Sequence, residues 1–508
     1  MKTDLHWMRI GLKPHHGICV PLFSLRSNKS CGIGEFFDLN PLIDWCSTLN
    51  LDCLQLLPLN DTGSDPSPYN PISSCALDPV YLSLRSLPSL GKLAPELEKW
   101  SFSNQALKFT VKQKKMEWLF LYFQQMFPSI SKKAEYQSFL NKHSWLKTYA
   151  LFKALKNTFG ETRWTEWPLQ FQSPEKVDFK EHKLAIEFHS FVQYLCFSQM
   201  EAVHAYANQK GIFIQGDIPI LLSPDSADVW AEPSLFYLNL SAGAPPDFYN
   251  SLGQHWGFPL FNWDAMRQDG FSWWKRRLNA IESLFSMYRI DHVVGFFRIW
   301  AIGEGQLPIE GFFIPSDPDL WGPQGKELLE MMIEASLLLP IAEDLGTIPD
   351  VVYRTLKDLG ICGTKVIRWQ RNFNGDREFV PYREYEPLSM TTVSTPDMEP
   401  LQAWWQNQPE DAEVFARFKG WEYPCVLTKE KHLEILRDAH HTPSFFHINL
   451  LQEYLALFPE LSWGNAEAER INTPGTLLPG NWTYRFRPLV EEIVSHQGLG
   501  EAFRKILN

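Results

Sequence analysis

The sequence predicts an α/β protein built on one (β/α)8 barrel of the TIM type. Short apolar runs typical of buried strands recur along the 508 residues, and helix-like segments separate several of them. Alternating strands and helices indicate a parallel sheet, and about eight such units favour a closed barrel. The runs are 17–22, 53–59, 211–220, 287–295, 337–346, 364–370, 391–395 and, as a possible eighth, 444–450.

The segment 38–50 illustrates the helices expected between strands. Leu39, Leu42, Ile43 and Cys46 recur there at helical spacing. An open, doubly wound sheet is the alternative architecture. The sequence contains neither a G-x-G-x-x-G after a strand nor a G-x-x-x-x-G-K motif, either of which would favour that alternative.

The spacing of the strands predicts a large insertion. Roughly 150 residues separate the second apolar run from the third, far more than the single crossover helix of a barrel unit needs. The stretches 112–127 and 145–160 show i, i+3, i+4 apolar spacing, and the second ends at a glycine suited to a helix C-terminus. A third helix is expected from about residue 181 to 208. We therefore predict a mostly helical insertion over 84–210 in a single barrel unit spanning 1–508.

Composition excludes several classes of function. Hydrophobic residues make up 44% and charged residues 21% of the chain, as in soluble globular proteins. No stretch reaches the roughly 18 apolar residues that span a bilayer, and the first residues carry no apolar signal-peptide core. The eight cysteines form no C-x-x-C pair, and no histidine–carboxylate spacing indicates a metal site. We expect a cytoplasmic protein without a metal or cofactor.

Charge argues against a nucleic-acid partner, because the net charge is −12. The basic clusters at 112–115 and 275–277 are interpreted as solvated helix faces. The pairs His15–His16 and His440–His441 are expected at the surface. Asp225 and Asp228 are interpreted as the N-terminus of a helix. Aromatic residues make up 14% of the chain, with 20 Trp, which suits stacking on sugar rings but also a large core.

Candidate catalytic carboxylates lie in two of the predicted strands. Arg289 and Asp291 share one face of a strand, and an Arg beside an Asp keeps the carboxylate ionised, as a nucleophile requires. The alternative is a structural ion pair. Glu343 and Asp344 end another apolar run, where partial desolvation suits a general acid, although acidic residues there also cap helices. Local chemistry does not choose between these two. Two carboxylates in different environments are the minimum for glycoside chemistry.

A third carboxylate, Asp397, follows the β-branched run Thr391–Thr395, which predicts a strand. Pro396 precedes it directly. Because proline pushes the preceding residue towards an extended conformation, the strand is expected to continue up to Asp397.

Ordered motifs along almost the whole chain resemble the 4-α-glucanotransferases, also called amylomaltases or disproportionating enzymes. The motifs include GICVPLFSLRSNKSCGIGEF, LQLLPLNDTG, SPYNPISS, GIFIQGDIPILLSPDSADVWAEP, GQHWGFPLFNWD, MYRIDHVVGFFRIW, AEDLG, RINTPGT and GNWTYRF. The GQHWGFPLFNW wording resembles the plant cytosolic branch of the family.

This resemblance implies an amylase-like barrel with inserted subdomains and no separate C-terminal β-domain. It implies a retaining double displacement in which Asp291 is the nucleophile, Glu343 the acid/base and Asp397 the residue that stabilises the transition state. It also implies that the segment 221–286 is an insertion carrying the acceptor-side loop. The implied substrate-binding residues are Tyr69, Asp217, Gln254, Trp256, Arg289 and Asn472. Maltooligosaccharides or glycogen-type α-glucans are the implied substrates, and the oligomeric state stays open.

The sequence departs from the family at Pro396, where a histidine usually contacts the sugar being cleaved. We expect an active enzyme with a weakened grip on the reacting glucose, or one in which another residue supplies that contact. Transfer and hydrolysis share one glycosyl-enzyme intermediate and differ only in the acceptor. The aromatic segment 243–263 suits acceptor binding and favours transfer. An α-glucan hydrolase of the same barrel type and a catalytically impaired glucan-binding protein are the two alternatives.

Overall fold

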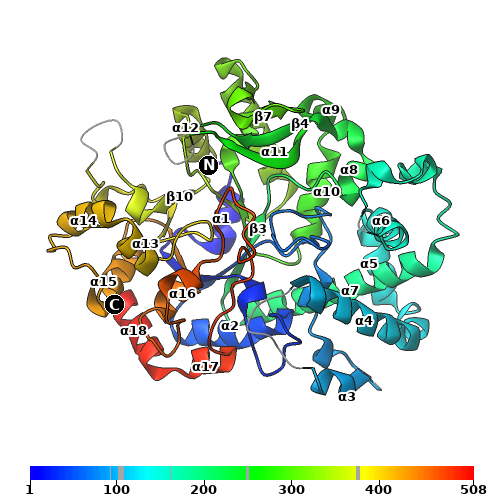
Figure 1. The fold of residues 1–508 in the computed structure, drawn as a ribbon, viewed down its shortest axis with the longest axis horizontal. Helices are drawn as coiled ribbons and strands as arrows, with labels where there is room; N and C mark the ends of the chain where they lie inside the picture. Colours follow the sequence, from blue (N-terminus) through cyan, green and yellow to red (C-terminus); the bar gives the residue numbers. More distant parts are fainter. Residues whose placement is uncertain (92, 101–107, 161, 247–250, 373–377) are drawn as a thin grey trace.

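Eight parallel strands form a closed barrel at the centre of the molecule. The structure is a computed structural model that describes residues 1–508 apart from 92, 101–107, 161, 247–250 and 373–377 (Figure 1). Around the barrel the strands follow one another in chain order, and the last pairs with the first. They are β1 (His15–Val20), β2 (Cys53–Leu56), β3 (Phe213–Ile218), β6 (Met287–Ile290), β9 (Leu339–Ala342), β10 (Gly363–Val366), β11 (Ser389–Thr392) and β12 (Phe446–Leu450).

The ring closes between β9 and β10. Ile341 and Cys362 form an isolated parallel bridge there, and the Ala342 N–H donates to the Cys362 carbonyl at 2.7 Å. Each of the eight predicted apolar runs overlaps one barrel strand, so the predicted (β/α)8 barrel is confirmed. Four of the eight barrel strands are buried along their whole length and each of the others has one half-buried residue, which is why they read as nearly continuous apolar runs.

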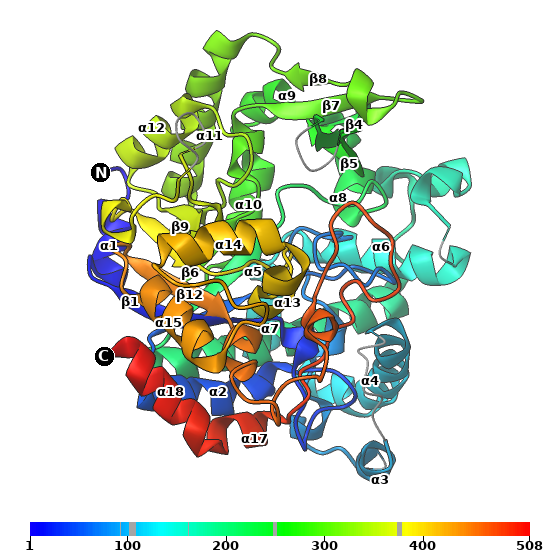
Figure 2. The same ribbon diagram turned by 60° about the vertical axis from the view of Figure 1, so that its left-hand side comes forward.

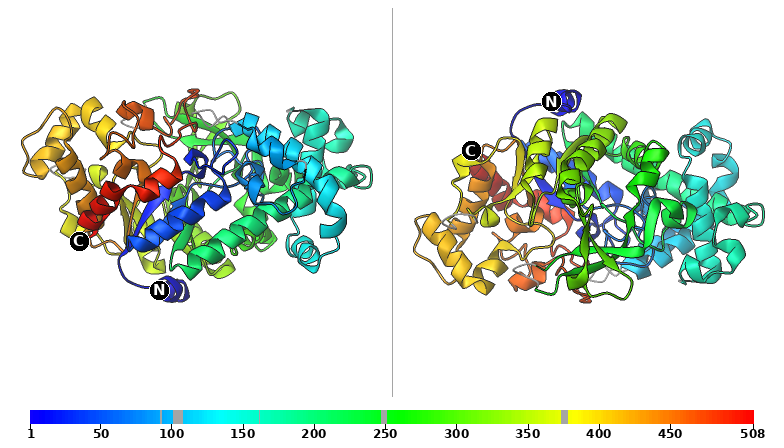
Figure 3. Two further views of the ribbon diagram at one scale, coloured as in Figure 1. Left: turned by 90° about the horizontal axis from the view of Figure 1, so that it is seen from below. Right: turned by 90° about the horizontal axis from the view of Figure 1, so that it is seen from above.

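Helices surround the barrel, as the two views in Figure 3 show. After β1 comes α2 (Leu39–Thr48), which buries the predicted residues Leu39, Leu42, Ile43 and Cys46. The short helix α1 (Asp4–Ile10) precedes β1 and stands at the edge of the molecule. The helices after the later strands are α8 (Ala227–Ala231), α9 (Trp263–Gln268), α10 (Ser272–Ile281), α11 (Trp321–Ala335), α12 (Asp350–Leu359), α13 (Leu401–Asn407), α14 (Pro409–Phe418), α15 (Lys429–His440), α16 (Leu451–Leu455), α17 (Val490–Ser495) and α18 (Gln497–Leu507).

The long connection from β2 to β3 is helical. It contains α3 (Leu93–Glu98), α4 (Lys108–Ile130), α5 (Ala134–Lys142), α6 (Leu146–Phe159) and α7 (Lys183–Gln209). The three predicted helices correspond to α4, α6 and α7, and α6 ends at Gly160, which has a φ of 69°. The helices α4, α5 and α6 lie at the right of Figure 1, whereas α7 also packs on α2 of the barrel. The extent of the insertion over 84–210 stays a prediction.

A second, antiparallel sheet lies apart from the ring of barrel strands (Figure 2). Its order is β5 (Gln254–Phe261), β4 (Phe236–Ala244), β7 (Ile299–Gly303) and β8 (Phe312–Ile314). The sequence analysis did not predict this sheet. Two of its strands come from the segment 221–286 and two from the connection after β6, so it joins two separate parts of the chain. Asp228 lies in the first turn of α8, next to the cap Ser226, as expected for a helix N-terminus.

The prediction that both basic clusters are solvated helix faces was wrong in part: Lys275 is exposed and Lys114 half-buried, but three of the basic residues are buried. Lys112 and Lys115 of α4 are buried. Lys112 pairs with Asp61 and Asp78, and Lys115 with Glu35 at 2.6 Å. Arg277 of α10 is also buried, and it donates to the Pro219 carbonyl at 2.6 Å and lies against Trp273 and Trp274. The carboxylates that pair with the two lysines and the carbonyl that binds Arg277 lie far away in the chain, so the local charge pattern did not reveal them.

The histidine pairs were also predicted wrongly as surface pairs. His15 and His440 are buried, His16 is half-buried, and His441 alone of the four is exposed. The cause is topology: β1 carries His15 and His16 and pairs with β12. His440 ends α15, and its ring bonds to the Tyr454 hydroxyl and lies 3.0 Å from His16, Nδ1 to Nδ1. Among the residues that the structure describes, no helix meets the length and apolarity that crossing a membrane requires.

Candidate active site

The candidate site lies where β3, β6 and β9 end. Asp217 of β3 is in register with Arg289 of β6. Asp291 and Glu343 directly follow the paired residues Ile290 and Ala342 of β6 and β9. The Glu343 N–H donates to the Ile290 carbonyl at 2.9 Å, which holds the two chain segments side by side. Strand order thus places both predicted catalytic carboxylates on neighbouring strands, at the end where barrels carry their chemistry.

Arg289 connects the acidic residues of the site. Its Nη1 donates to Oδ1 and Oδ2 of Asp217 at 2.9 and 3.0 Å and to Oδ1 of Asp291 at 2.9 Å. Its Nη2 lies 3.8 Å from Oε2 of Glu343. Burial alone lowers the pKa of Arg289, but the surrounding negative charge, led by Asp217, raises it well above its ordinary value. The guanidinium is therefore always charged and fixes the positions of three carboxylates.

Glu343 is held by two backbone groups. Its Oε2 accepts the His292 N–H at 2.7 Å and its Oε1 the Leu345 N–H at 3.1 Å. His292 adopts a left-handed conformation, with a φ of 44°. Burial raises the pKa of Glu343 to about 7, against the opposing charge of Arg289. A carboxyl group with this pKa can carry a proton near neutral pH, as a general acid requires.

The structure distinguishes Glu343 from Asp344. Glu343 lies within reach of Arg289, whereas Oδ1 of Asp344 accepts the Thr364 N–H of β10 at 2.6 Å. Neither residue caps a helix, because α12 begins only at Asp350 and its cap position is Pro349. The helix-cap alternative is therefore wrong for both residues, and Glu343 is the one of the two that lies beside Arg289.

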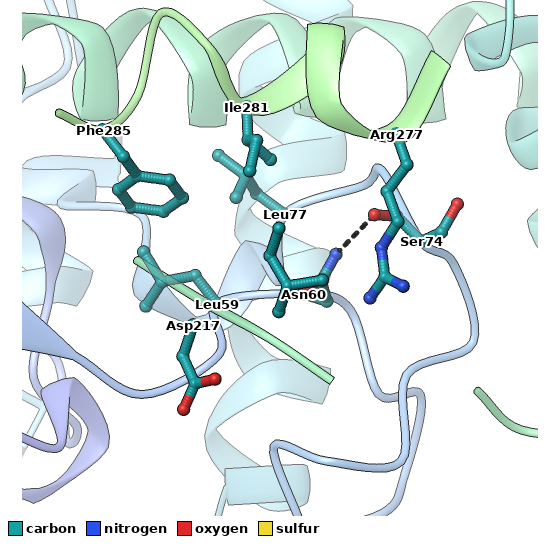
Figure 4. A pocket seen from close by; sticks show the side chains of 9 residues that line it. Leu59, Asn60, Ser74, Leu77, Asp217, Arg277, Ile281 and Phe285 are labelled. Carbon is teal, nitrogen blue, oxygen red and sulfur yellow. Dashed lines mark hydrogen bonds between the residues drawn. The ribbon is translucent and has the colours of Figure 1, made fainter. Parts of the chain in front are cut away.

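Tyr69 reaches the site from the loop after β2. Its hydroxyl donates to Oδ2 of Asp217 at 2.7 Å, and its ring centroid lies 5.4 Å from that of Trp482. Burial raises the pKa of Asp217 to about 6, although Arg289 opposes the rise. In Figure 4 the carboxylate of Asp217 points away from Arg277. Asp217 and Arg277 both line a cavity of about 10 Å³. That volume holds about one water molecule, so this cavity is not a sugar site.

Asp397 lies in a turn and not at the end of a strand. The strand β11 ends at Thr392, and the Met398 N–H donates to the Thr395 carbonyl at 3.0 Å. Pro396 thus occupies the second position of a β-turn, where its fixed φ is favoured. The prediction that the strand continues to Asp397 was wrong, because β11 already ends at Thr392 and the chain then turns at Thr395–Met398.

The side chain of Asp397 bonds to a second predicted residue. Its Oδ1 accepts the Asn472 amide N–H at 2.6 Å. Asp397 is exposed, yet partial desolvation by the surrounding protein raises its pKa, with the bond from Asn472 opposing the rise and the charge of Asp291 adding to it. The charge of Arg289 opposes the rise in the pKa of Asp397, so this carboxylate lies within electrostatic range of both Asp291 and Arg289.

Restoring a donor at position 396 tests the departure from the family pattern. We expect Pro396→His to lower the KM for maltotriose about fivefold, since one neutral hydrogen bond contributes about 1 kcal/mol. Pro396→Ala is the matched control, because it restores the backbone N–H, as Pro396→His does, but adds no side-chain donor. Steady-state kinetics of both variants decide the question. If Pro396→His binds no better than Pro396→Ala, the missing contact is supplied elsewhere or is not made.

Gln254 and Trp256 approach from β5 of the second sheet. The Trp256 ring lies perpendicular to that of His292, with the centroids 5.0 Å apart. Its Nε1–H donates to Oε1 of Gln254 at 3.2 Å. Sequence reasoning missed His292 and Trp482 as parts of the site. Both stand in the motifs YRIDH and GNWTYRF, but their positive φ values of 44° and 60° cannot be read from a sequence.

One group with metal-ligand chemistry occurs among the described residues. His15, Asp52 and Cys53 bring ligand atoms within 4.8 Å of one another. His15 and Cys53 begin β1 and β2, so the group lies at the opposite end of the barrel from the candidate site. Nδ1 of His15 already bonds to Asp52 at 2.8 Å.

Comparisons with known proteins agree with this geometry. A family model described as 4-alpha-glucanotransferase matches residues 20–491. A 4-alpha-glucanotransferase of Chlamydia caviae is 43% identical over 98% of this chain and 96% of its own length. A 4-alpha-glucanotransferase of Oryza sativa subsp. japonica is 25% identical, over 97% of this chain and 69% of its own length. The structure of an amylomaltase from Streptococcus agalactiae in complex with acarbose superposes with a TM-score of 0.84 at 26% identity, over 97% of this chain and 98% of that one. The chain therefore belongs to the 4-alpha-glucanotransferase family.

Proposed function

We propose that this 4-alpha-glucanotransferase moves α-1,4-glucan segments or glucose from a maltooligosaccharide to a glucan or glucose acceptor by retaining double displacement at Asp291 and Glu343. The observation that carries the proposal is the placement of these two carboxylates on neighbouring barrel strands, both near one guanidinium. Neighbouring strands lie about 4.8 Å apart. This spacing suits the carboxyl separation of about 5–5.5 Å in retaining enzymes.

In the first step, a carboxylate oxygen of Asp291 attacks the anomeric carbon of the donor. Glu343 gives its proton to the glycosidic oxygen, the bond from carbon to that oxygen breaks, and the shortened glucan leaves. The hydrogen bond from Arg289 at 2.9 Å orients the nucleophile. The pKa of Glu343, about 7, supports its role as the proton donor.

In the second step, the hydroxyl of an acceptor glucan gives its proton to the Glu343 carboxylate and attacks the same anomeric carbon. The bond to Asp291 breaks, and two inversions restore the original configuration. Asp397 accepts hydroxyl hydrogens of the reacting sugar in this scheme, and Asn472 holds it in place at 2.6 Å. Tyr69 supplies a ring for the sugar face, and Asp217 fixes its hydroxyl.

Trp256 supports transfer over hydrolysis. Its ring packs on His292, the residue after the proposed nucleophile, so an acceptor bound to β5 lies next to the intermediate. A bound and oriented acceptor reacts faster than water because positioning contributes several kcal/mol. An α-glucan hydrolase is the second candidate, since the first step is common to both.

Trapping the intermediate tests the proposal. Glu343→Gln slows the second step, so a maltosyl fluoride blocked at its terminal 4-hydroxyl should accumulate a covalent adduct. Intact-mass spectrometry and peptide mapping should place the sugar on the peptide that contains Asp291. An adduct on another carboxylate would refute the double displacement at Asp291. So would the absence of any adduct in Glu343→Gln, if this variant then behaves like Asp291→Asn.

A further inference from the structure

Asp344 follows the proposed acid/base and faces another part of the protein. It is buried, with 5% of its surface exposed. With Tyr353 and Leu356 of α12 and Lys365 of β10, it lines a pocket of about 370 Å³ between the barrel wall and this helix. Its carboxylate thus lies outside the group of side chains that Arg289 connects.

The bonds of Asp344 lie at the closure of the barrel. The ladder between β9 and β10 is limited to the bridge between Ile341 and Cys362. After this bridge, two bonds that involve side chains join the strands. Oγ1 of Thr364 donates to the Ala342 carbonyl at 2.9 Å, and the Thr364 N–H donates to Oδ1 of Asp344 at 2.6 Å. Thr364 therefore binds the residue before Glu343 and the residue after it.

Gly363 makes room for this carboxylate. A Cβ atom at position 363 would lie 2.4 Å from Oδ2 of Asp344 and 2.9 Å from its Cγ. Both distances are shorter than protein atoms tolerate, and Asp344 is too short and too enclosed to move aside while keeping its bond to Thr364. The close approach of Asp344 to β10 thus requires glycine at this position.

We propose that Asp344, Gly363 and Thr364 form a clasp that orients Glu343, so that Asp344 is a positioning residue for the reaction. This inference rests on the proposed role of Glu343. The link is short, because the N–H that binds Oε1 of Glu343 belongs to Leu345, the next residue after Asp344. Loss of the clasp frees that N–H, and the carboxyl group of Glu343 loses one of its two backbone donors.

Substitutions at Asp344 separate positioning from charge. We expect Asp344→Ala to lower kcat for maltotriose about 10- to 100-fold, with KM changed less than about threefold, since a misplacement of about 1 Å costs a catalytic group this much. Loss of the Leu345 N–H raises the pKa of Glu343, so the alkaline limb of the pH–kcat profile moves to higher pH. Asp344→Asn keeps an Oδ1 acceptor for Thr364 and should retain kcat and the pH profile. Asp358→Ala, on the exposed face of α12, is the control.

A double-mutant cycle tests the clasp from its other side. Gly363→Ala should lower kcat as far as Asp344→Ala does, because the new methyl group displaces the carboxylate. In Asp344→Ala/Gly363→Ala the clash is gone, so the double variant should be no slower than Asp344→Ala alone. Gly464→Ala is the matched control, since a Cβ there meets no atom within 4 Å.

Four results would overturn the clasp: wild-type kcat in Asp344→Ala, equal losses in Asp344→Asn and Asp344→Ala, multiplied losses in the double variant, or an unchanged pH profile. Thermal melts show which variants fold. If Asp344→Ala does not fold, Asp344→Asn and Gly363→Ala decide by the same criteria. Glu343→Gln tests the proposed function, whereas Asp344→Ala tests the clasp. If Glu343→Gln is inactive and Asp344→Ala is fully active, the clasp is refuted and the proposed role of Glu343 stands.

Discussion

Asp291→Asn is expected to abolish glucan transfer, lowering kcat by at least about 10⁴-fold. The amide keeps the shape of the side chain, and its oxygen still accepts the hydrogen bond from Arg289, but it cannot form the covalent bond to the anomeric carbon. Binding should survive, because Tyr69, Asp217 and Asp397 are untouched. Steady-state transfer from maltotriose and calorimetric binding of maltooligosaccharide measure the two properties separately.

Asp358→Asn is the matched control, an exposed aspartate on α12 outside the site. It should leave kcat and binding unchanged. Transfer by Asp291→Asn at more than about one hundredth of the wild-type rate would place the nucleophile elsewhere. Tight binding without turnover by the unmutated chain would instead favour a glucan-binding protein that has lost catalysis.

Glu343→Gln is expected to lower kcat for maltotriose about 10²- to 10⁴-fold, the range of general acid catalysis. The first step needs protonated Glu343, whose pKa burial raises to about 7. The wild-type rate should therefore be full below this pH and fall as pH rises through it. The glutamine variant should lack that alkaline limb, because glutamine does not titrate. A pH series from about 5 to 9 measures both effects.

A donor with a good leaving group isolates the role of the acid. Fluoride departs without a proton, so Glu343→Gln should release fluoride from maltosyl fluoride in a burst at close to the wild-type rate. Asp291→Asn should release none. If Glu343→Gln loses maltosyl fluoride turnover as severely as maltotriose turnover, Glu343 is not the acid of the first step.

The barrel was predictable because parallel strands buried on both faces read as apolar runs. The second sheet was not. The burial of β4 follows no regular alternation, and β5 alternates between half-buried and exposed residues only over 254–258, so neither strand has the apolar run of a barrel strand. Its order also depends on pairing strands from either side of β6.

The candidate site was likewise predictable only in part from the sequence. Arg289 and Asp291 were predicted as partners because strand alternation places them on one face. The bond from Arg289 to Asp217 depends on the register of β3 with β6, which only the folded topology provides. From the sequence, Glu343 and Asp344 were equally good candidates for the general acid. In the structure their side chains point to different neighbours, Glu343 towards Arg289 and Asp344 towards Thr364.

The wrong predictions share a physical cause. Lys112 and His15 were assigned to the surface from their type and neighbours, but carboxylates and rings distant in the chain surround them. At Asp397 the local rule for proline did not decide where the strand ends, because β11 already stops at Thr392, before the turn from Thr395 to Met398. The assignment of Asp397 to the site came from the resemblance, and its bond to Asn472 and its electrostatic coupling to Asp291 agree with it.

The product distribution from maltotriose tests the central claim most directly. Incubation of the purified protein with maltotriose, followed by chromatographic separation of the products by length, shows transfer and hydrolysis in one experiment. Transfer predicts a ladder of glucans longer than maltotriose, with the number of reducing ends constant. A steady rise in reducing ends with glucose and maltose as the only products would contradict the account and show a hydrolase.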